Sequence, residues 1–208
     1  MSKAGKPLIS FNVKNGVYST DGIAIKPLNF LTALSREKSQ TTKDIYGDGE
    51  LQLSINNDQG YTGTLTMTAA DPDYNKDLGM TMELVGGSVA NVTQHKSIRH
   101  YIGLESYDMI TLPDGSTFEK VTGKIWICGV TASAPSETLN QNTTDFNENN
   151  VDYPLAINGV DLKNTAGDAI YVDANGLTYK AFSAKSLPGA ADYADFLLKP
   201  PVPKKIAV

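Results

Sequence analysis

The stretch from residue 60 to residue 80 constrains the fold most strongly, because its pattern indicates a strand, a short helix, a glycine and another strand. Over residues 61–69 one side carries Tyr61, Gly63, Leu65, Met67 and Ala69 and the other carries four threonines, and this period of two predicts a strand with one buried face. Asp71 is a suitable N-cap, and Pro72 has a fixed φ that suits the first turn of a helix. Gly79 is a natural stop for that helix.

The remaining apolar segments predict about ten short strands in total. The most apolar of them is Lys124–Ala132, which contains the only tryptophan. Strict alternation assigns its side chains to two faces: Ile125, Ile127, Gly129 and Thr131 on one, and Trp126, Cys128 and Val130 on the other. Because both faces are largely apolar, we expect a central strand that is covered on both sides.

Turn-forming residues suggest how the strands connect. The cluster at 56–60 predicts a hairpin turn, and so does Asp173–Gly176. Residues 190–198 carry apolar side chains at helical spacing and predict a second short helix. We therefore expect one domain over residues 1–208, mainly β. Its architecture would be a β-sandwich or partly closed barrel with one or two short flanking helices and long inter-strand arm loops.

Two segments do not fit a compact sheet. Residues 35–50 are polar, lack an apolar period and end in a glycine-rich turn. A loop of this length inside a domain is unusual unless it has a function, so it is a candidate inter-subunit arm; the alternative is a flexible surface loop. The proline-rich tail at 199–208 is expected to be extended, and to dock only if a neighbouring subunit receives it.

The sequence offers no set of residues for catalysis, metal binding or cofactor binding. His95 and His100 are the only histidines and are interpreted as surface or packing residues. Asp44, Asp48 and Glu50 resemble a calcium loop in composition but not in spacing, so a turn explains them better. Cys128 lies in an apolar strand and is predicted to be a buried thiol. We therefore expect no catalytic, cofactor-binding or metal residues, no cofactor and no enzymatic activity.

Charge limits the kind of partner. The formal net charge is −5, and Arg36 and Arg99 are the only arginines. A protein that grips DNA needs a basic stripe, so tight phosphate binding is excluded, whereas an acidic surface would let DNA slide past. No apolar run is long enough for a membrane span, and the first residues lack the apolar core of a signal peptide, so synthesis in a cytoplasm is expected.

The order of landmarks resembles a known family. The glycine-flanked strand, the short acidic helix ending at Asp77-Leu78-Gly79 and the upstream turn Tyr46–Gly49 are similar to features of the major tail (tail-tube) proteins of long-tailed, non-contractile bacteriophages. The resemblance covers about residues 12–162 and rests on order and spacing, since none of these motifs is a signature by itself.

The resemblance implies a structural virion protein of the phage tail, assembled in the host cytoplasm. Such subunits form hexameric rings that stack into a tube, through which double-stranded DNA passes without specific binding. It also implies contacts with the tape measure, distal tail and terminator proteins. If the chain forms a conduit, we predict a net acidic lining. The alternative is a carbohydrate- or receptor-binding β-sandwich on a particle surface, since Tyr and Trp with Asn and Asp can form a sugar platform. Trp126 itself lies in an apolar strand, where burial in the core is the favoured interpretation.

Overall fold

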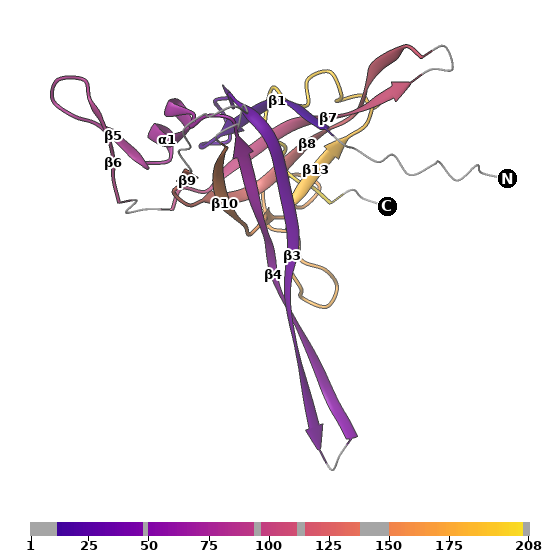
Figure 1. The fold of residues 1–208 in the computed structure, drawn as a ribbon. Coiled ribbons are helices and arrows are strands. Elements are labelled where there is room, and N and C mark those ends of the chain that lie inside the picture. Colours follow the sequence, from indigo (N-terminus) through magenta and orange to yellow (C-terminus); the bar gives the residue numbers. More distant parts are fainter. Residues whose placement is uncertain (1–11, 48–49, 94–96, 112–114, 138–149, 206–208) are drawn as a thin grey trace.

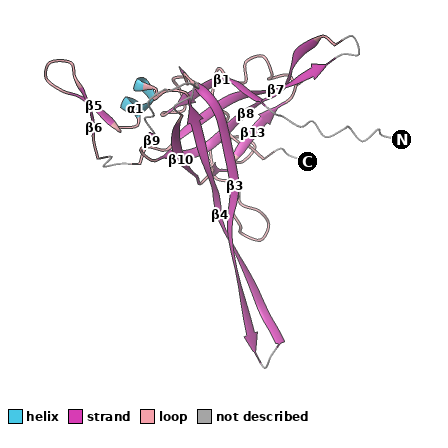
Figure 2. Ribbon diagram, viewed as in Figure 1, coloured by secondary structure: helices cyan, strands magenta, loops and turns pink. Residues whose placement is uncertain are grey.

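The computed structural model describes residues 12–47, 50–93, 97–111, 115–137 and 150–205. The chain is mainly β, with a single short helix in that part (Figures 1 and 2). Its main sheet runs in the order β2-β1-β7-β8-β10-β4-β3, while β13 pairs with β8 and β9 pairs with β10. The strands of this sheet are β1 Asn12–Ser19, β2 Lys26–Pro27, β3 Leu31–Gly47, β4 Glu50–Met67, β7 His100–Thr111, β8 Thr117–Ala132, β9 Ser136–Glu137, β10 Val151–Ile157 and β13 Ser183–Ser186.

Two small antiparallel pairs and the helix complete the fold. β5 (Thr81–Glu83) pairs with β6 (Val89–Asn91), and β11 (Val160–Asp161) pairs with β12 (Lys180–Ala181). Helix α1 spans Pro72–Asp77 and connects β4 to β5.

The main sheet curls but does not close. Its two ends approach at Gly16 of β1, where the carbonyl accepts a hydrogen bond of 2.8 Å from the Leu28 amide. A Cβ on Gly16 would lie 2.8 Å from the end of the Leu31 side chain of β3, so the two ends of the sheet come close at this glycine. No ladder joins β1 to β3 among the described strands, which leaves β2 and β3 as open edges. The predicted class, a mainly β sandwich or partly closed barrel, is confirmed.

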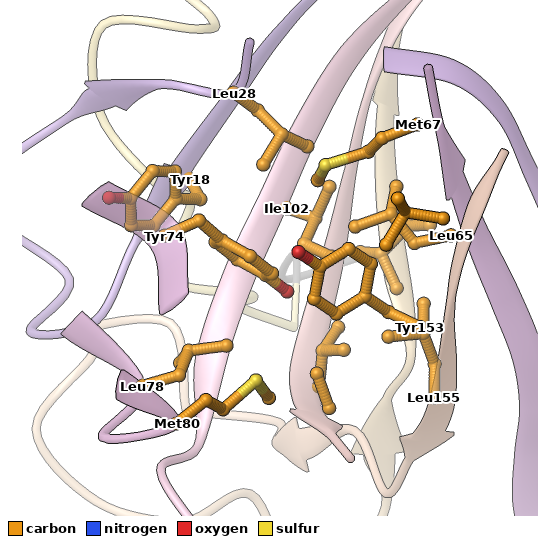
Figure 3. Packing of buried hydrophobic residues seen from close by; sticks show 14 of the residues in the cluster. Tyr18, Leu28, Leu65, Met67, Tyr74, Leu78, Met80, Ile102, Tyr153 and Leu155 are labelled. Atoms are coloured by element: carbon orange, nitrogen blue, oxygen red, sulfur yellow. The ribbon is translucent and has the colours of Figure 1, made fainter. Parts of the chain in front are cut away.

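The larger apolar core lies between the curled sheet and α1 (Figure 3). The organising strand contributes Leu65 and Met67, both fully buried, as its alternation predicts. Tyr74 of α1 and Leu78, the C-cap of α1, pack in the same core. At about 25 cal/mol per Å² of apolar surface, this burial is the main source of stability.

A smaller core covers the opposite face of β8, around Trp126, Cys128 and Phe196. β8 pairs with β7, β10 and β13, so it is a central strand, and the two cores cover its two faces. The prediction of a central strand covered on both faces is therefore confirmed. The assignment of side chains to faces is wrong after Gly129. That residue has φ +69° and forms a bulge, so Val130 joins Ile127 in the larger core.

The predicted first helix is confirmed in detail. The Asp71 carboxylate accepts hydrogen bonds from the amides of Asp73 and Tyr74, and Gly79 has a φ of +69° directly after the C-cap. The predicted second helix is wrong. Residues 191–197 form successive turns, in which amides such as those of Tyr193 and Leu198 bond to the carbonyl three residues earlier.

The predicted hairpin turn at 56–60 is also wrong. β4 is one strand from Glu50 to Met67 and pairs with β3 from end to end, with a register shift at Gln59 and Gly60, so the chain reverses between Gly47 and Glu50. Consequently the polar segment 35–50 is not a loop: residues 35–47 are strand. The turn predicted at 173–176 is confirmed, because the Asp173 amide donates to the Leu177 carbonyl.

Candidate assembly surfaces

The most prominent feature is the β3–β4 hairpin, which extends far beyond the sheet (Figure 1). β10 pairs with β4 only from Tyr61 to Met67, whereas β3 and β4 pair with each other as far as Gly47 and Glu50. The outer half is therefore a two-stranded ribbon, which we call the arm (residues 40–58). A two-stranded ribbon has only marginal stability in water on its own, so the arm is suited to pairing with another surface.

The base of the arm is rigid. Gly63 of β4 lies against the Ser35 carbonyl of β3, and any Cβ at that position would collide with this oxygen. The Arg36 guanidinium lies over the Tyr61 ring, 5.6 Å from its centroid. Beside them is an open groove of about 560 Å³, lined by residues 35–37 and 62–64.

A second ribbon is formed by the outer ends of β7 and β8 (Figure 1). Within the described residues β1 pairs with β7 as far as Tyr107, while β7 and β8 continue to pair to Thr111 and Thr117. Near its base Ser106 and Thr122 are both buried, and their hydroxyls lie 2.9 Å apart. The sequence does not predict this extension, because alternation of side chains is the same in a two-stranded ribbon as in a strand that pairs on both sides.

The third projection is the β5–β6 hairpin, whose tip is apolar and exposed. Four of its side chains are largely solvent-exposed: Met82 (58%), Leu84 (48%), Val85 (107%) and Val89 (65%). The Leu84 amide donates to the Ser88 carbonyl at 2.7 Å, and this bond closes the tip. Exposed apolar groups gathered on one projection are typical of interaction sites.

A buried polar network fixes α1, from which this hairpin emerges. The Tyr153 hydroxyl donates to the Asn75 side-chain oxygen at 2.9 Å, and the Tyr18 hydroxyl donates to Asp77 at 2.7 Å. The Asp71 carboxylate also accepts from the Asn29 amide, which ties the helix to the segment before β3. Met80, the third residue after the helix, donates its amide to the Asn75 carbonyl. The hairpin therefore starts from a fixed base.

The described histidine, His100, is a core residue. It is fully buried, its Nε2 lies 2.9 Å from the Tyr74 hydroxyl, and burial lowers its pKa to about 4. The packing interpretation is thus confirmed for His100, while His95 lies outside the described residues. The same burial strongly raises the pKa of Tyr74.

Cys128 and Trp126 also have the predicted structural roles. Cys128 is buried and free, and burial raises the pKa of its thiol to about 11. The Trp126 indole is fully buried and donates to the Phe196 carbonyl at 2.6 Å. The favoured interpretation of Trp126 as a core residue is therefore confirmed, and a buried ring cannot serve a sugar platform.

Of the acidic residues considered for calcium, the two that lie within the described residues are not brought together as a metal site. Asp44 and Glu50 lie on opposite strands of the arm, and Asp48 is outside the described residues. Across residues 12–205, apart from the undescribed gaps, no three His, Cys, Asp or Glu side chains cluster as metal ligands would. α1, with six residues, is too short to cross a membrane, and the described chain holds no longer helix.

The C-terminal tail docks on its own chain, so the expectation that it needs a neighbour is wrong up to residue 205. The Lys163 amide donates to the Pro203 carbonyl at 2.8 Å, and the Lys205 amide donates to the Lys163 carbonyl at 3.0 Å. Lys205 also lies over the Tyr171 ring. Sequence reasoning missed this pairing because Pro203 lacks an N–H but still offers a carbonyl.

The fold class is therefore a curled, open β-sheet with three projecting hairpins. No family model matches the chain, and neither does any curated protein sequence. Among solved structures it is similar to a chain of the anti-feeding prophage baseplate, with 9% sequence identity and a TM-score of 0.41. That similarity covers 73% of this chain and 92% of the baseplate chain.

Proposed function

We propose that this protein is a structural subunit that polymerises with copies of itself, and not a catalyst. The observation that carries the proposal is the arm. Its strands leave the sheet as a two-stranded ribbon with which no other described strand pairs, and β3 is an edge of the main sheet among the described strands. Open edges in a monomer invite pairing with another chain, and pairing among copies removes them.

The arrangement of projections favours head-to-tail contacts. The arm, the β7–β8 ribbon and the β5–β6 hairpin point in three different directions (Figure 1). Copies that contact one another through different surfaces form a closed ring if the rotation between them closes, and an open filament if it does not. Three projections in different directions support contacts both around a ring and between rings.

The specific form of the proposal is a phage tail-tube subunit. Six copies would form a ring, stacked rings would form a tube, and double-stranded DNA would pass through it. The net charge of −5 supports a conduit that does not retain DNA. An acidic lining, contacts with tape measure, distal tail and terminator proteins, and a location in the virion tail belong to the same proposal.

Negative-stain electron microscopy of the concentrated protein tests this proposal. We expect rings or tubes of uniform width, and light scattering should show that the mass rises with concentration. Protein that remains monomeric at the highest soluble concentration would contradict self-assembly. Filaments without a hollow centre would contradict the tube but not the polymerisation.

A further inference from the structure

Three Asn-Gly pairs occur in the chain, at 15–16, 158–159 and 175–176. An asparagine side chain loses ammonia most readily before glycine, because glycine has no Cβ to hinder attack by its backbone nitrogen on the asparagine Cγ. The attack also requires the backbone to move, since the nitrogen must reach that carbon. The three pairs consist of the same two residues, so the surrounding structure decides which of them reacts.

The pair Asn15-Gly16 is held by the main sheet. The Asn15 side-chain amide donates a hydrogen bond of 2.6 Å to a carboxylate oxygen of Glu105. Gly16 is buried, and its carbonyl accepts from the Leu28 amide where the two ends of the sheet approach each other. Movement of this backbone would therefore disturb the contact between the ends of the sheet.

The pair Asn158-Gly159 is held between strands. The Asn158 amide donates to the Gly129 carbonyl at 3.1 Å, and the Gly159 carbonyl accepts from the Arg99 guanidinium. Gly159 is buried, and a Cβ on it would lie 2.9 Å from the Ala181 carbonyl oxygen. This backbone can move only if the neighbouring strands move with it.

The pair Asn175-Gly176 lies in an exposed turn. Both residues are exposed, and a Cβ on Gly176 would meet nothing within 4 Å. The amides of Asn175 and Gly176 donate to the side chain and the carbonyl of Asp173, which belongs to the same turn. Local opening of an exposed turn disturbs neither core, so its free-energy cost is small.

We propose that Asn175 is a site of spontaneous covalent modification, where the side-chain amide becomes a carboxylate through a cyclic succinimide. The Gly176 nitrogen bonds to the Asn175 Cγ, the Cγ–Nδ2 bond breaks, and ammonia leaves with the proton of the Gly176 amide. Water then opens the ring at either carbonyl and leaves aspartate or isoaspartate at position 175. The net reaction consumes water, releases ammonia and needs neither an enzyme nor an oxidant.

The product would weaken the turn. The Asp173 carboxylate accepts from the amides of Asn175 and Leu177, from the Tyr179 hydroxyl and from the Asn175 side chain. The reaction replaces the last of these donors with a second carboxylate, and like charges repel. Isoaspartate also inserts a methylene group into the backbone. We therefore expect faster amide exchange at Leu177 in the modified chain than in the unmodified one.

Peptide mapping by mass spectrometry tests the proposal on dilute, full-length wild-type protein. The protein is kept at mildly alkaline pH, which favours attack by the glycine nitrogen, and an isoaspartyl methyltransferase labels the product. We expect conversion at Asn175 to be at least about tenfold faster than at Asn15 or Asn158, equivalent to about 1.4 kcal/mol of local opening at the two held pairs. In concentrated urea the three sites should react at similar rates, because the fold no longer distinguishes them.

Asn175→Gln is the matched control. Glutamine keeps the amide but needs a larger ring to react, so position 175 should gain no label, while conversion at Asn15 and Asn158 stays as in the wild type. Similar conversion at all three pairs of the folded protein would overturn the proposal. An Asn175 that reacts in urea and is inert in the folded chain would also overturn it. The measurement uses no property of assembly, so its failure would leave the proposed function intact.

Discussion

The Tyr153 hydroxyl of β10 donates a hydrogen bond of 2.9 Å to the side-chain oxygen of Asn75 in α1. Both residues are buried, so water cannot replace the bond if it is lost. This contact joins α1 to the middle of the sheet, so the position of α1 depends on the packing of the core.

Replacing Tyr153 with phenylalanine should therefore destabilise the protein. The substitution removes only the hydroxyl and leaves the Asn75 oxygen without that donor, which costs about 1–2 kcal/mol. Urea unfolding of the monomer measures the loss. Tyr179→Phe, which removes an exposed hydroxyl bonded to Asp173, is the matched control and should change stability by less than about 0.5 kcal/mol. Equal effects of the two substitutions would contradict the proposed importance of the buried bond.

Asp71→Ala should release both the helix and the segment before β3. The Asp71 carboxylate accepts from the amides of Asp73, Tyr74 and Asn29, and loss of an N-cap alone costs about 1 kcal/mol. We expect a loss of about 2 kcal/mol in urea unfolding, and faster amide exchange at residues 73–78. The exposed neighbour provides the comparison: Asp73→Ala should cost a few tenths of a kcal/mol. Unchanged exchange in Asp71→Ala would be inconsistent with this prediction.

Stability should fall between about pH 6.5 and pH 4 because of His100. Its folded-state pKa is about 4, below its ordinary value of 6.5, so the unfolded chain binds more protons in this range. The free energy of unfolding therefore rises with pH across the window, and the contribution is complete above it. The difference approaches about 3 kcal/mol. Urea unfolding at several pH values should show a shallower slope for His100→Gln than for the wild type; parallel curves would contradict the assignment.

Gly129→Ala should be much more harmful than Gly176→Ala. Both glycines have positive φ, at +69° and +81°, so alanine strains the backbone at either site by about 1–2 kcal/mol. At Gly176 a Cβ meets nothing within 4 Å, whereas at Gly129 it collides with the Gly159 carbonyl. We expect a loss of about 3 kcal/mol or more for Gly129→Ala, because the backbone must move. Thermal unfolding of both variants measures the two losses of stability. The loss in Gly176→Ala reports the backbone strain alone, and the additional loss in Gly129→Ala reports the collision.

Shortening the arm should abolish assembly without affecting the body. Thr42 and Asn56 are directly opposite, so residues 43–55 can be replaced by Asn-Gly, a two-residue hairpin turn. The main sheet lies beyond the replaced segment, and the melting temperature should stay within a few degrees of the wild type. Electron microscopy should show no rings or tubes. Normal tubes from the shortened chain would show that assembly does not need the arm, and would contradict its role in the proposed function.

Local patterns predicted much of the fold. The strand–helix–glycine unit around Asp71 was predictable because its alternation, cap and stop all agree. The length of β4 was not, since the cluster at 56–60 has the composition of a turn and yet lies inside the strand, with residues 56–58 paired to β3. There the backbone hydrogen bonds to β3 outweigh the turn propensity of the sequence. Such pairing can be recognised only when the partner strand is known.

Other features depended on tertiary contacts. The bulge at Gly129 moves Val130 to the other face, and no alternation rule shows where a register will shift. The apolar tip of β5–β6 was present in the sequence as Leu84-Val85 before two glycines, but a buried strand end gives the same pattern. Exposure distinguishes the two, and exposure depends on where α1 places the hairpin.

The continuity of β4 has a mechanical consequence. The same strand forms one side of the arm and, from Tyr61 to Met67, pairs with β10 inside the body. A force that pulls the arm outward along its length therefore loads these backbone hydrogen bonds together, in shear, instead of opening them one after another. A neighbour that held the arm would be attached through the hydrogen-bonded interior of the sheet.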